Sequence, residues 1–226
     1  MNTKTVEKWE LTPEKFLNQT ETAKLLQRGD ELWVLGTTGK RKALVRDAFL
    51  IQTAIYTGLR NSEICCLKVA DMHVKAGESH IVVSEEGAKG SKPRIVHIGT
   101  EYKAIAKRYL AWKQEQGETD ASEYALRTER ARHYTPSALW RRWRRYSTKT
   151  LHAARHTNAT LLYQATRNLR AVQKQLGHSR ITTTQIYADV PADVMKESMA
   201  AMERLARSFK KNPRQGVVPA ADESGS

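Results

Sequence analysis

The sequence predicts an α+β fold that is mainly α-helical and carries one small antiparallel β-sheet. Two observations lead to this fold class. Apolar residues recur at helical spacing through most of the 226 residues, and two β-branched runs, Ile81–Val83 and Arg94–Ile98, stand close together in the first half. With 40% hydrophobic residues and no internal repeat, the chain is long enough for one packed domain, which we expect to span residues 18–209.

The chain is expected to open with a short lead-in, residues 1–17, and a first helix. Asn18 and Glu21 have the spacing of a capping box, in which each side chain accepts a hydrogen bond from the other residue's backbone N–H. We expect this helix to end at Gly29, because glycine is a poor helix former. At the other end of the chain, residues 210–226 have little to bury and are expected to be disordered.

A longer helix is predicted over residues 41–57, where apolar residues again recur at helical spacing. Gly58 stands where a C-cap glycine is expected. Arg60 lies in the turn that follows, and Ser62 and Glu63 begin another short helix. An arginine is therefore placed at a turn between two helices.

The two β-branched runs predict a hairpin, or two strands of a small antiparallel sheet. Residues 87–93 between them are glycine-rich and basic, which is typical of a connecting loop. This loop carries Lys89 and Lys92. Lysine in an exposed hairpin is ordinarily a solubilising residue, so its position alone does not indicate a role in chemistry.

Helical spacing returns at residue 100, and a polar stretch, residues 114–134, is predicted to be a loop. Thr135 then begins a helix in which Trp140 and Trp143 are apolar. Four arginines are packed among these residues: Arg141, Arg142, Arg144 and Arg145.

The segment 150–206 predicts a series of short helices. Thr150 and Asn168 can cap the first two, and Gly177 closes the second. A third helix is expected in the residues that follow Gly177. Residues 192–207 then form an amphipathic helix.

The net charge is +14, so the surface should attract a polyanion. Nucleic acid is the first candidate and an anionic membrane surface the second. The sequence contains no apolar run that could span a bilayer and no apolar signal-peptide core, so we expect a cytoplasmic protein.

The two cysteines, Cys65 and Cys66, are adjacent, which suits neither a disulfide between them nor a zinc site.

Cleavage of a phosphodiester bond without a metal requires three kinds of side chain. Fixed cationic donors must hold the non-bridging oxygens, and arginine suits this because its planar fork binds phosphate at two points. A lysine or histidine must protonate the leaving 5′-oxygen. A nucleophile must form a reversible covalent bond, and a tyrosyl ester keeps the energy of the broken bond for resealing.

The sequence contains all three kinds. His152 and Arg155 stand three residues apart, on one face of a predicted helix. His178 follows Gly177 at a tight turn, and Tyr187 lies nine residues after His178. Together with the arginine and the lysine noted above, the candidate catalytic residues are Arg60, Lys89, His152, Arg155, His178 and Tyr187.

The order and spacing of these residues resemble the tyrosine recombinase (phage integrase) family. The matching segments are TGLRNSEI, AKGSKPRIVHI, LHAARHTNATLL and QLGHSRITTTQIY, and the resemblance covers residues 18–206. It implies the catalytic-domain fold of that family. It also implies a site-specific recombinase that acts on double-stranded DNA by integration, excision, inversion or resolution, with no metal or other cofactor.

The resemblance further implies a role for each candidate in binding the phosphate. Arg60 and Arg155 are expected to hold the scissile phosphate, and His178 is expected to bind one of its non-bridging oxygens.

The proton transfers and the attack are assigned in the same way. Lys89 is expected to protonate the leaving 5′-hydroxyl, with Lys92 as the alternative in the same loop. His152 is expected to accept and donate protons around the nucleophile, Tyr187, which forms a 3′-phosphotyrosyl link. Two rounds of strand exchange would take place within a homotetramer assembled on DNA.

Other basic residues are expected to contact the DNA, although a cluster of arginines is most often only a solvated face. These residues are Lys92, Arg94, Arg141, Arg142, Arg144, Arg145 and Arg180.

Most members of the family carry an additional N-terminal helical domain that clamps the other face of the duplex, and residues 1–17 are too few to form one. We therefore expect either a single-domain recombinase or dependence on an accessory DNA-binding protein. The helix at 192–207 is expected either to dock on a neighbouring protomer or to pack on its own domain.

Two other functions remain open. Residues 167–186 also resemble a helix-turn-helix with Gly177 in the turn, which suits a non-catalytic DNA-binding regulator. Nicking and relaxing of DNA, as by a type IB topoisomerase, is the third function. All three predict salt-sensitive DNA binding, so only a covalent adduct separates the enzymes from the regulator, and only recombinant products separate the two enzymes.

Overall fold

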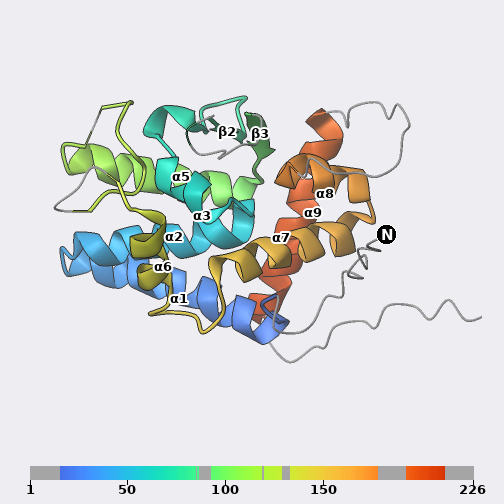
Figure 1. The fold of residues 1–226 in the computed structure, drawn as a ribbon, viewed down its shortest axis with the longest axis horizontal. Coiled ribbons are helices and arrows are strands. Elements are labelled where there is room, and N and C mark those ends of the chain that lie inside the picture. Colours follow the sequence, from blue (N-terminus) through green and yellow to red (C-terminus); the bar gives the residue numbers. More distant parts are fainter. Residues whose placement is uncertain are drawn as a thin grey trace, which may run out of the picture.

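The computed structural model describes residues 16–84, 86, 93–118, 120–128, 133–177 and 192–211. It is mainly helical with a three-stranded antiparallel sheet, so the predicted fold class is confirmed (Figure 1). The helices are α1 (Gln19–Thr38), α2 (Lys42–Thr57), α3 (Asn61–Cys66), α5 (Thr100–Glu115), α6 (Pro136–Trp143), α7 (Leu151–Thr166), α8 (Leu169–Leu176) and α9 (Ala192–Lys211). The strands are β1 (Met72–His73), β2 (His80–Val83) and β3 (Arg94–His97), and a short 3-10 helix spans Val69–Asp71.

α2 is the central helix of the core. Every residue from Val45 to Thr57 is buried, because α2 packs against α1, α5, α6 and α7. The predicted C-cap is confirmed: Gly58 ends the helix in the left-handed conformation, with φ +65°. A Cβ atom at Gly58 would also lie 2.8 Å from Asn158 Oδ1, so both the backbone and the packing require glycine here.

α1 begins at the predicted capping box, in which Asn18 and Glu21 bind each other's backbone N–H groups. The prediction that Gly29 ends this helix is wrong, because α1 continues to Thr38. Gly29 is buried instead at the contact with α2, where a Cβ atom would lie 3.1 Å from the Gln52 side chain. The close approach of the two helices offsets the low helix propensity of glycine, which costs about 1 kcal/mol relative to alanine.

The predicted hairpin is confirmed as β2 and β3, and β1 adds a short third strand that was not predicted. The register pairs Met72 with Ile81 and Ile81 with Val96, and this row is buried against the helices. The next row carries three histidines on the opposite face of the sheet, since side chains alternate along a strand: His73, His80 and His97. In Figure 1 the sheet is drawn above α3 and α5, and β3 contacts α8 and α9.

Two further predicted caps are confirmed. The Thr150 side chain accepts the Ala153 N–H at the start of α7, and Asn168 does the same for α8. Gly177 ends α8 with φ +64°. The described residues between α5 and α6 contain no helix, as expected for residues 114–134. The helix predicted after Gly177 lies outside the described residues.

α9 packs on its own domain, against α7 and α1, rather than projecting away from it. Met199, Met202 and Ala206 of α9 are fully buried. The helix predicted over residues 192–207 therefore exists, and its buried apolar residues pack against other helices of the same chain. Within the described residues, no helix is long and apolar enough to cross a membrane.

Candidate active site

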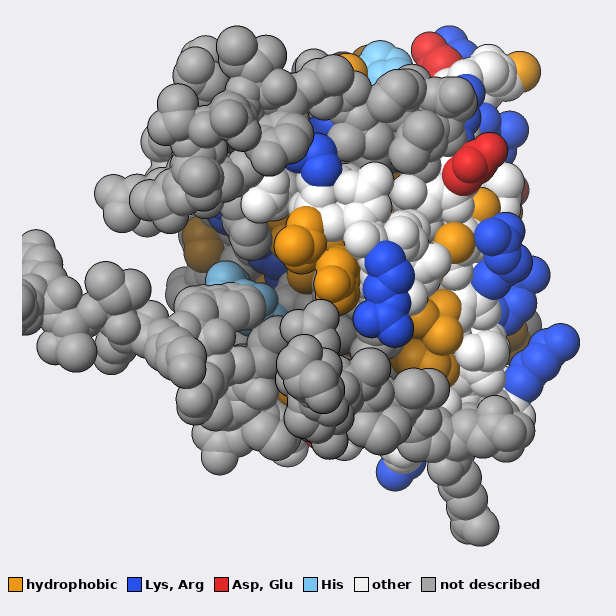
Figure 2. Space-filling model, turned by 90° about the vertical axis from the view of Figure 1, so that its right-hand side faces the viewer, with side chains coloured by type: hydrophobic (Ala, Val, Ile, Leu, Met, Phe, Trp, Pro, Cys, Tyr) orange, Lys and Arg blue, Asp and Glu red, His pale blue; other side chains and the backbone are white. Residues whose placement is uncertain are grey.

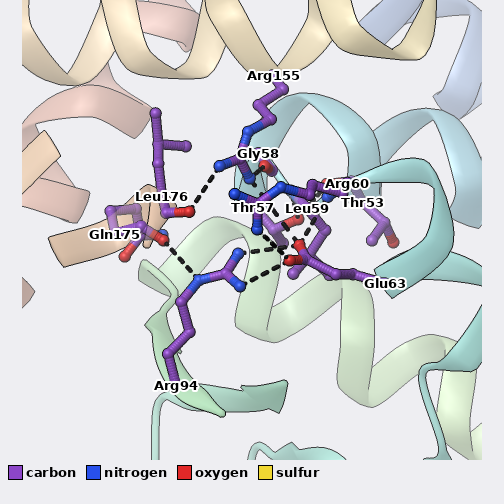
Figure 3. A network of polar contacts seen from close by, with 10 residues as sticks. All are labelled: Thr53, Thr57, Gly58, Leu59, Arg60, Glu63, Arg94, Arg155, Gln175 and Leu176. Carbon is purple, nitrogen blue, oxygen red and sulfur yellow. Dashed lines mark hydrogen bonds and ion pairs between the residues drawn. The ribbon is translucent and has the colours of Figure 1, made fainter. Parts of the chain in front are cut away.

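Three arginines from different elements converge on one carboxylate, that of Glu63 (Figure 3). Arg60 lies in the turn between α2 and α3, Arg94 on β3 and Arg155 on α7. The Glu63 side chain is fully buried. Burial raises the pKa of this carboxyl, but the hydrogen bonds and charges of Arg94 and Arg60 outweigh that effect, so the pKa lies below its ordinary value. Glu63 is therefore ionised, and the three arginines share its negative charge.

Arg60 is held by the first turn of α3. Its backbone N–H donates to Glu63 Oε2 at 2.7 Å, and its guanidinium donates to Oε1 at 2.7 Å. The side chain nevertheless stays 31% exposed. One edge of the guanidinium is thus fixed by the protein while the rest remains accessible to an anion.

Arg155 is buried and is anchored at the ends of two helices. Its guanidinium donates to the carbonyl oxygen of Gly58, after α2, at 2.7 Å, and to that of Leu176, at the end of α8, at 2.6 Å. Carbonyl groups at helix C-termini favour a cation. Burial, followed by the charge of Arg60, lowers the pKa of Arg155 to about 10, so Arg155 remains charged at neutral pH.

His152 lies on α7 one turn before Arg155, and its side chain is exposed. Its ring meets that of His156 edge to face, with centroids 4.3 Å apart. Partial burial and the charges of Arg155 and Arg60 lower the pKa of His152, which favours a neutral imidazole that can accept a proton. The structure thus brings together three of the six candidate catalytic residues: Arg60, His152 and Arg155.

The other candidates lie outside the described residues: Lys89, Lys92, His178, Arg180 and Tyr187. Described residues adjoin both of the segments that carry these candidates. β3 begins at Arg94, shortly after the lysines, and Gly177 directly precedes His178. Both of these points adjoin the arginine cluster, because Arg94 binds Glu63 and Leu176 binds Arg155.

Two arginines that were expected to contact DNA bind buried carboxylates. Arg94 binds Glu63 through both of its terminal nitrogens. Arg142 binds the buried carboxylate of Asp47 and the carbonyl oxygen of Ala43. An arginine that satisfies a buried acid supplies little charge to a DNA backbone, and the sequence does not distinguish such arginines from surface ones.

The remaining arginines of α6 and the turn after it are exposed: Arg141, Arg144 and Arg145. The Arg144 guanidinium lies 5.7 Å from the centre of the Trp140 ring, which is itself 45% exposed. Trp143, by contrast, is fully buried and anchors the helix. Figure 2 shows another face of the molecule, on which Lys and Arg side chains are visibly more common than Asp and Glu, in keeping with the net charge.

Glu63 is the residue of this site that sequence reasoning missed. The sequence indicates only that Glu63 stands at the start of a helix, three residues after Arg60. The available signal was that spacing, which places an acid one helical turn from a candidate phosphate-binding arginine.

Residues 15–193 match the model of the phage integrase family. The tyrosine recombinase XerA of Pyrococcus furiosus is 32% identical over 166 residues, which are 70% of this chain and 55% of that protein. The tyrosine recombinase XerA of Thermococcus onnurineus is 33% identical over 192 residues, which are 81% of this chain and 61% of that protein.

The fold was found in solved structures too. A crystal structure of the XerH site-specific recombinase bound to its difH substrate matches with a TM-score of 0.58 and 26% identity, over 74% of this chain and 47% of that one. The chain thus spans little more than half the length of the curated relatives above.

Proposed function

Because the chain belongs to the phage integrase family, we propose that it is the strand-transferring part of a site-specific DNA recombinase. It breaks and rejoins double-stranded DNA through a 3′-phosphotyrosyl intermediate on Tyr187. The outcome is integration, excision, inversion or resolution.

The observation that carries this proposal is the arginine cluster around Glu63. Three guanidinium groups and one carboxylate meet at one place, so the cluster is cationic and suited to a phosphate. Arg60 and Arg155 are fixed by short hydrogen bonds before any ligand arrives. Donors that are held in place need no reorganisation when charge develops on the non-bridging oxygens, which is the main source of electrostatic catalysis.

The reaction that these residues support is a transesterification. The phenol oxygen of Tyr187 attacks the scissile phosphorus, and the bond from phosphorus to the 5′-oxygen breaks. His152 accepts the phenol proton, and Lys89 donates a proton to the leaving 5′-oxygen. Resealing is the reverse reaction, with a 5′-hydroxyl as nucleophile and the tyrosine as leaving group.

The remaining candidates hold the phosphate during both steps. Arg60 and Arg155 bind its non-bridging oxygens, and His178 donates one more hydrogen bond. This scheme uses no metal and no cofactor.

Double-stranded DNA is the proposed partner, and four copies are proposed to assemble on it. An accessory DNA-binding protein, or chain outside the present sequence, would clamp the second face of the duplex. Since the apolar face of α9 is covered in cis, docking of α9 on a neighbouring copy requires this helix to leave its place on α7 and α1.

Covalent trapping tests the proposal. The protein is incubated with a mixed pool of nicked and branched DNA and quenched with detergent, and protein attached to a DNA 3′ end is measured. The wild type and Tyr163→Phe, a substitution on α7 away from the arginine cluster, should both form the adduct, whereas Tyr187→Phe should not. DNA binding without any adduct would contradict the proposal and favour the non-catalytic regulator.

A further inference from the structure

Arg94 faces the interior of the domain. Its two terminal nitrogens donate to Glu63 Oε1 at 2.7 Å and Oε2 at 2.9 Å, and its side chain is only 11% exposed. Its Nε makes a longer contact of 3.5 Å with the carbonyl oxygen of Gln175 (Figure 3). Both terminal nitrogens of the Arg94 guanidinium are therefore bound by the carboxylate of Glu63.

α8 is tied to β3 at the same place. The buried Gln175 side chain donates to the backbone carbonyl oxygen of His97 at 2.8 Å and accepts its N–H at 3.1 Å. Gly177 completes the fit, because a Cβ atom there would overlap Cδ of Arg94. The end of α8 is thus shaped around the Arg94 side chain.

This arrangement acts on Arg155 by two routes. The carbonyl oxygen of Leu176, at the end of α8, accepts a hydrogen bond from Arg155, so whatever fixes α8 fixes that acceptor. In addition, Arg94 and Arg60 occupy the Glu63 oxygens at 2.7 to 2.9 Å, while Arg155 stays 3.9 Å away. The charge of Arg155 is therefore the least neutralised of the three.

We propose that Arg94 is a positioning residue for strand transfer: it holds Glu63 away from Arg155 and sets Arg155 for the phosphate, without touching DNA itself. This inference rests on the function proposed above. When Arg94 is missing, the buried Glu63 carboxylate loses two hydrogen bonds and takes Arg155 as its new partner, because a buried charge requires a counter-ion. The guanidinium then turns away from the phosphate.

The test compares the wild type with Arg94→Met, Arg94→Lys, Glu63→Gln and the double variant Arg94→Met/Glu63→Gln. Arg28→Met, on an exposed arginine of α1, serves as the control. The rate of adduct formation is measured on a nicked duplex, and DNA affinity is measured as a function of salt concentration.

We expect Arg94→Met to slow adduct formation about 100-fold, since a misplaced catalytic group costs about that much. Arg94→Lys, which keeps the charge but lacks the fork, should be slowed about 10-fold. The double variant should recover about 10-fold over Arg94→Met, because the acid that captures Arg155 is gone. The dependence of log affinity on log salt should be unchanged in Arg94→Met, whereas loss of one phosphate contact lowers its slope by about 0.9.

Several results would overturn the inference. Adduct formation in Arg94→Met and Arg94→Lys at the rate of Arg28→Met would remove any role in positioning. A double variant as slow as Arg94→Met, with Glu63→Gln alone forming the adduct at the wild-type rate and so leaving Arg60 in place, would exclude the route through Glu63. A salt slope reduced by one phosphate contact in Arg94→Met would make Arg94 a DNA contact. If the wild type itself forms no adduct, the proposed function fails instead, and the salt slope still decides whether Arg94 touches DNA.

Discussion

The carboxylate of Glu203 on α9 accepts a hydrogen bond from the backbone N–H of Tyr102 at 3.0 Å. It accepts a second one from the backbone N–H of Glu101 at 2.9 Å, and together the two bonds cap the start of α5. The N-cap residue of α5 is Gly99, which has no side chain to do this. A Cβ atom at Gly99 would overlap the Glu203 carboxylate, so the glycine makes room for a cap supplied from the far end of the chain. Glu203 therefore links α9 to the start of α5.

Glu203→Ala should destabilise the domain. The substitution leaves two N–H groups without their acceptor, and we expect the free energy of unfolding to fall by about 2 kcal/mol. Denaturant titration provides the measurement. Glu197→Ala, on the exposed side of the same helix, is the control and should change the value by less than about 0.5 kcal/mol. Equal effects of the two substitutions would show that the cap contributes nothing specific.

The stability contributed by Glu203 should depend on pH. Burial raises the pKa of this carboxyl, although its two backbone hydrogen bonds act in the opposite direction. A raised folded-state pKa means that the contribution is complete below the ordinary value of 4.5 and is lost as pH rises through the folded pKa. The unfolding free energy of the wild type, measured relative to that of Glu203→Gln, should therefore fall from acid to neutral pH. A wild type that gains stability relative to Glu203→Gln over this range contradicts the prediction.

Gly177→Ala should cost more than the same change at another left-handed glycine. Gly77 has φ +79°, and nothing lies within 4 Å of the place that a Cβ atom would take, so Gly77→Ala measures backbone strain alone, about 1 kcal/mol. Gly177→Ala adds the collision with Arg94, and we expect about 2 kcal/mol more. Thermal or denaturant unfolding of the two variants decides this, and equal costs would mean that Arg94 moves aside without penalty.

His152 should titrate below the ordinary histidine value of 6.5, because partial burial and the charges of Arg155 and Arg60 all disfavour its protonated form. NMR titration of the imidazole gives its pKa directly. Arg60→Gln should raise that pKa, whereas Arg28→Gln should not change it. In the proposed reaction His152 accepts the tyrosine proton, which only its neutral ring can do, so the rate of adduct formation should fall as pH drops through the same pKa.

Substitution of Arg142 should affect stability, whereas substitution of Arg144 should affect DNA binding. Arg142 pairs with Asp47, whose side chain is only 1% exposed, so Arg142→Gln should cost about 3 kcal/mol of folding free energy. Arg144→Gln, at an exposed position, should cost less than about 0.5 kcal/mol but should weaken DNA binding in a salt-dependent manner. A loss of stability in Arg144→Gln but not in Arg142→Gln would contradict the pairing of Arg142 with Asp47.

Much of the fold could be predicted because its signals are local. The caps at Asn18, Thr150 and Asn168 involve residues three positions apart, and the left-handed glycines stand directly after their helices. Gly29 misled the prediction because its role depends on Gln52 of another helix. β1 could not be predicted, because a strand of two residues has no periodicity to detect.

The pairings of the arginines around Glu63 could not be predicted from the sequence. An arginine carries the same charge whether it faces solvent or an internal acid, so the sequence could not separate the buried Arg94 from the exposed Arg144. The partner of Arg94 stands 31 residues earlier in the chain. Only the fold, which places β3 beside α3 and α8, brings that acid within reach.

The hydrogen bonds between Gln175 and His97 have a second consequence, for solubility. β3 is an edge strand of the sheet, as is β1, and an edge strand with unpaired backbone groups can recruit a strand from another molecule. The Gln175 amide occupies both backbone groups of His97 and so behaves like one residue of a fourth strand. A helix side chain thereby withholds the backbone groups of one edge residue from pairing with another molecule, two residues from the exposed apolar side chain of Ile95.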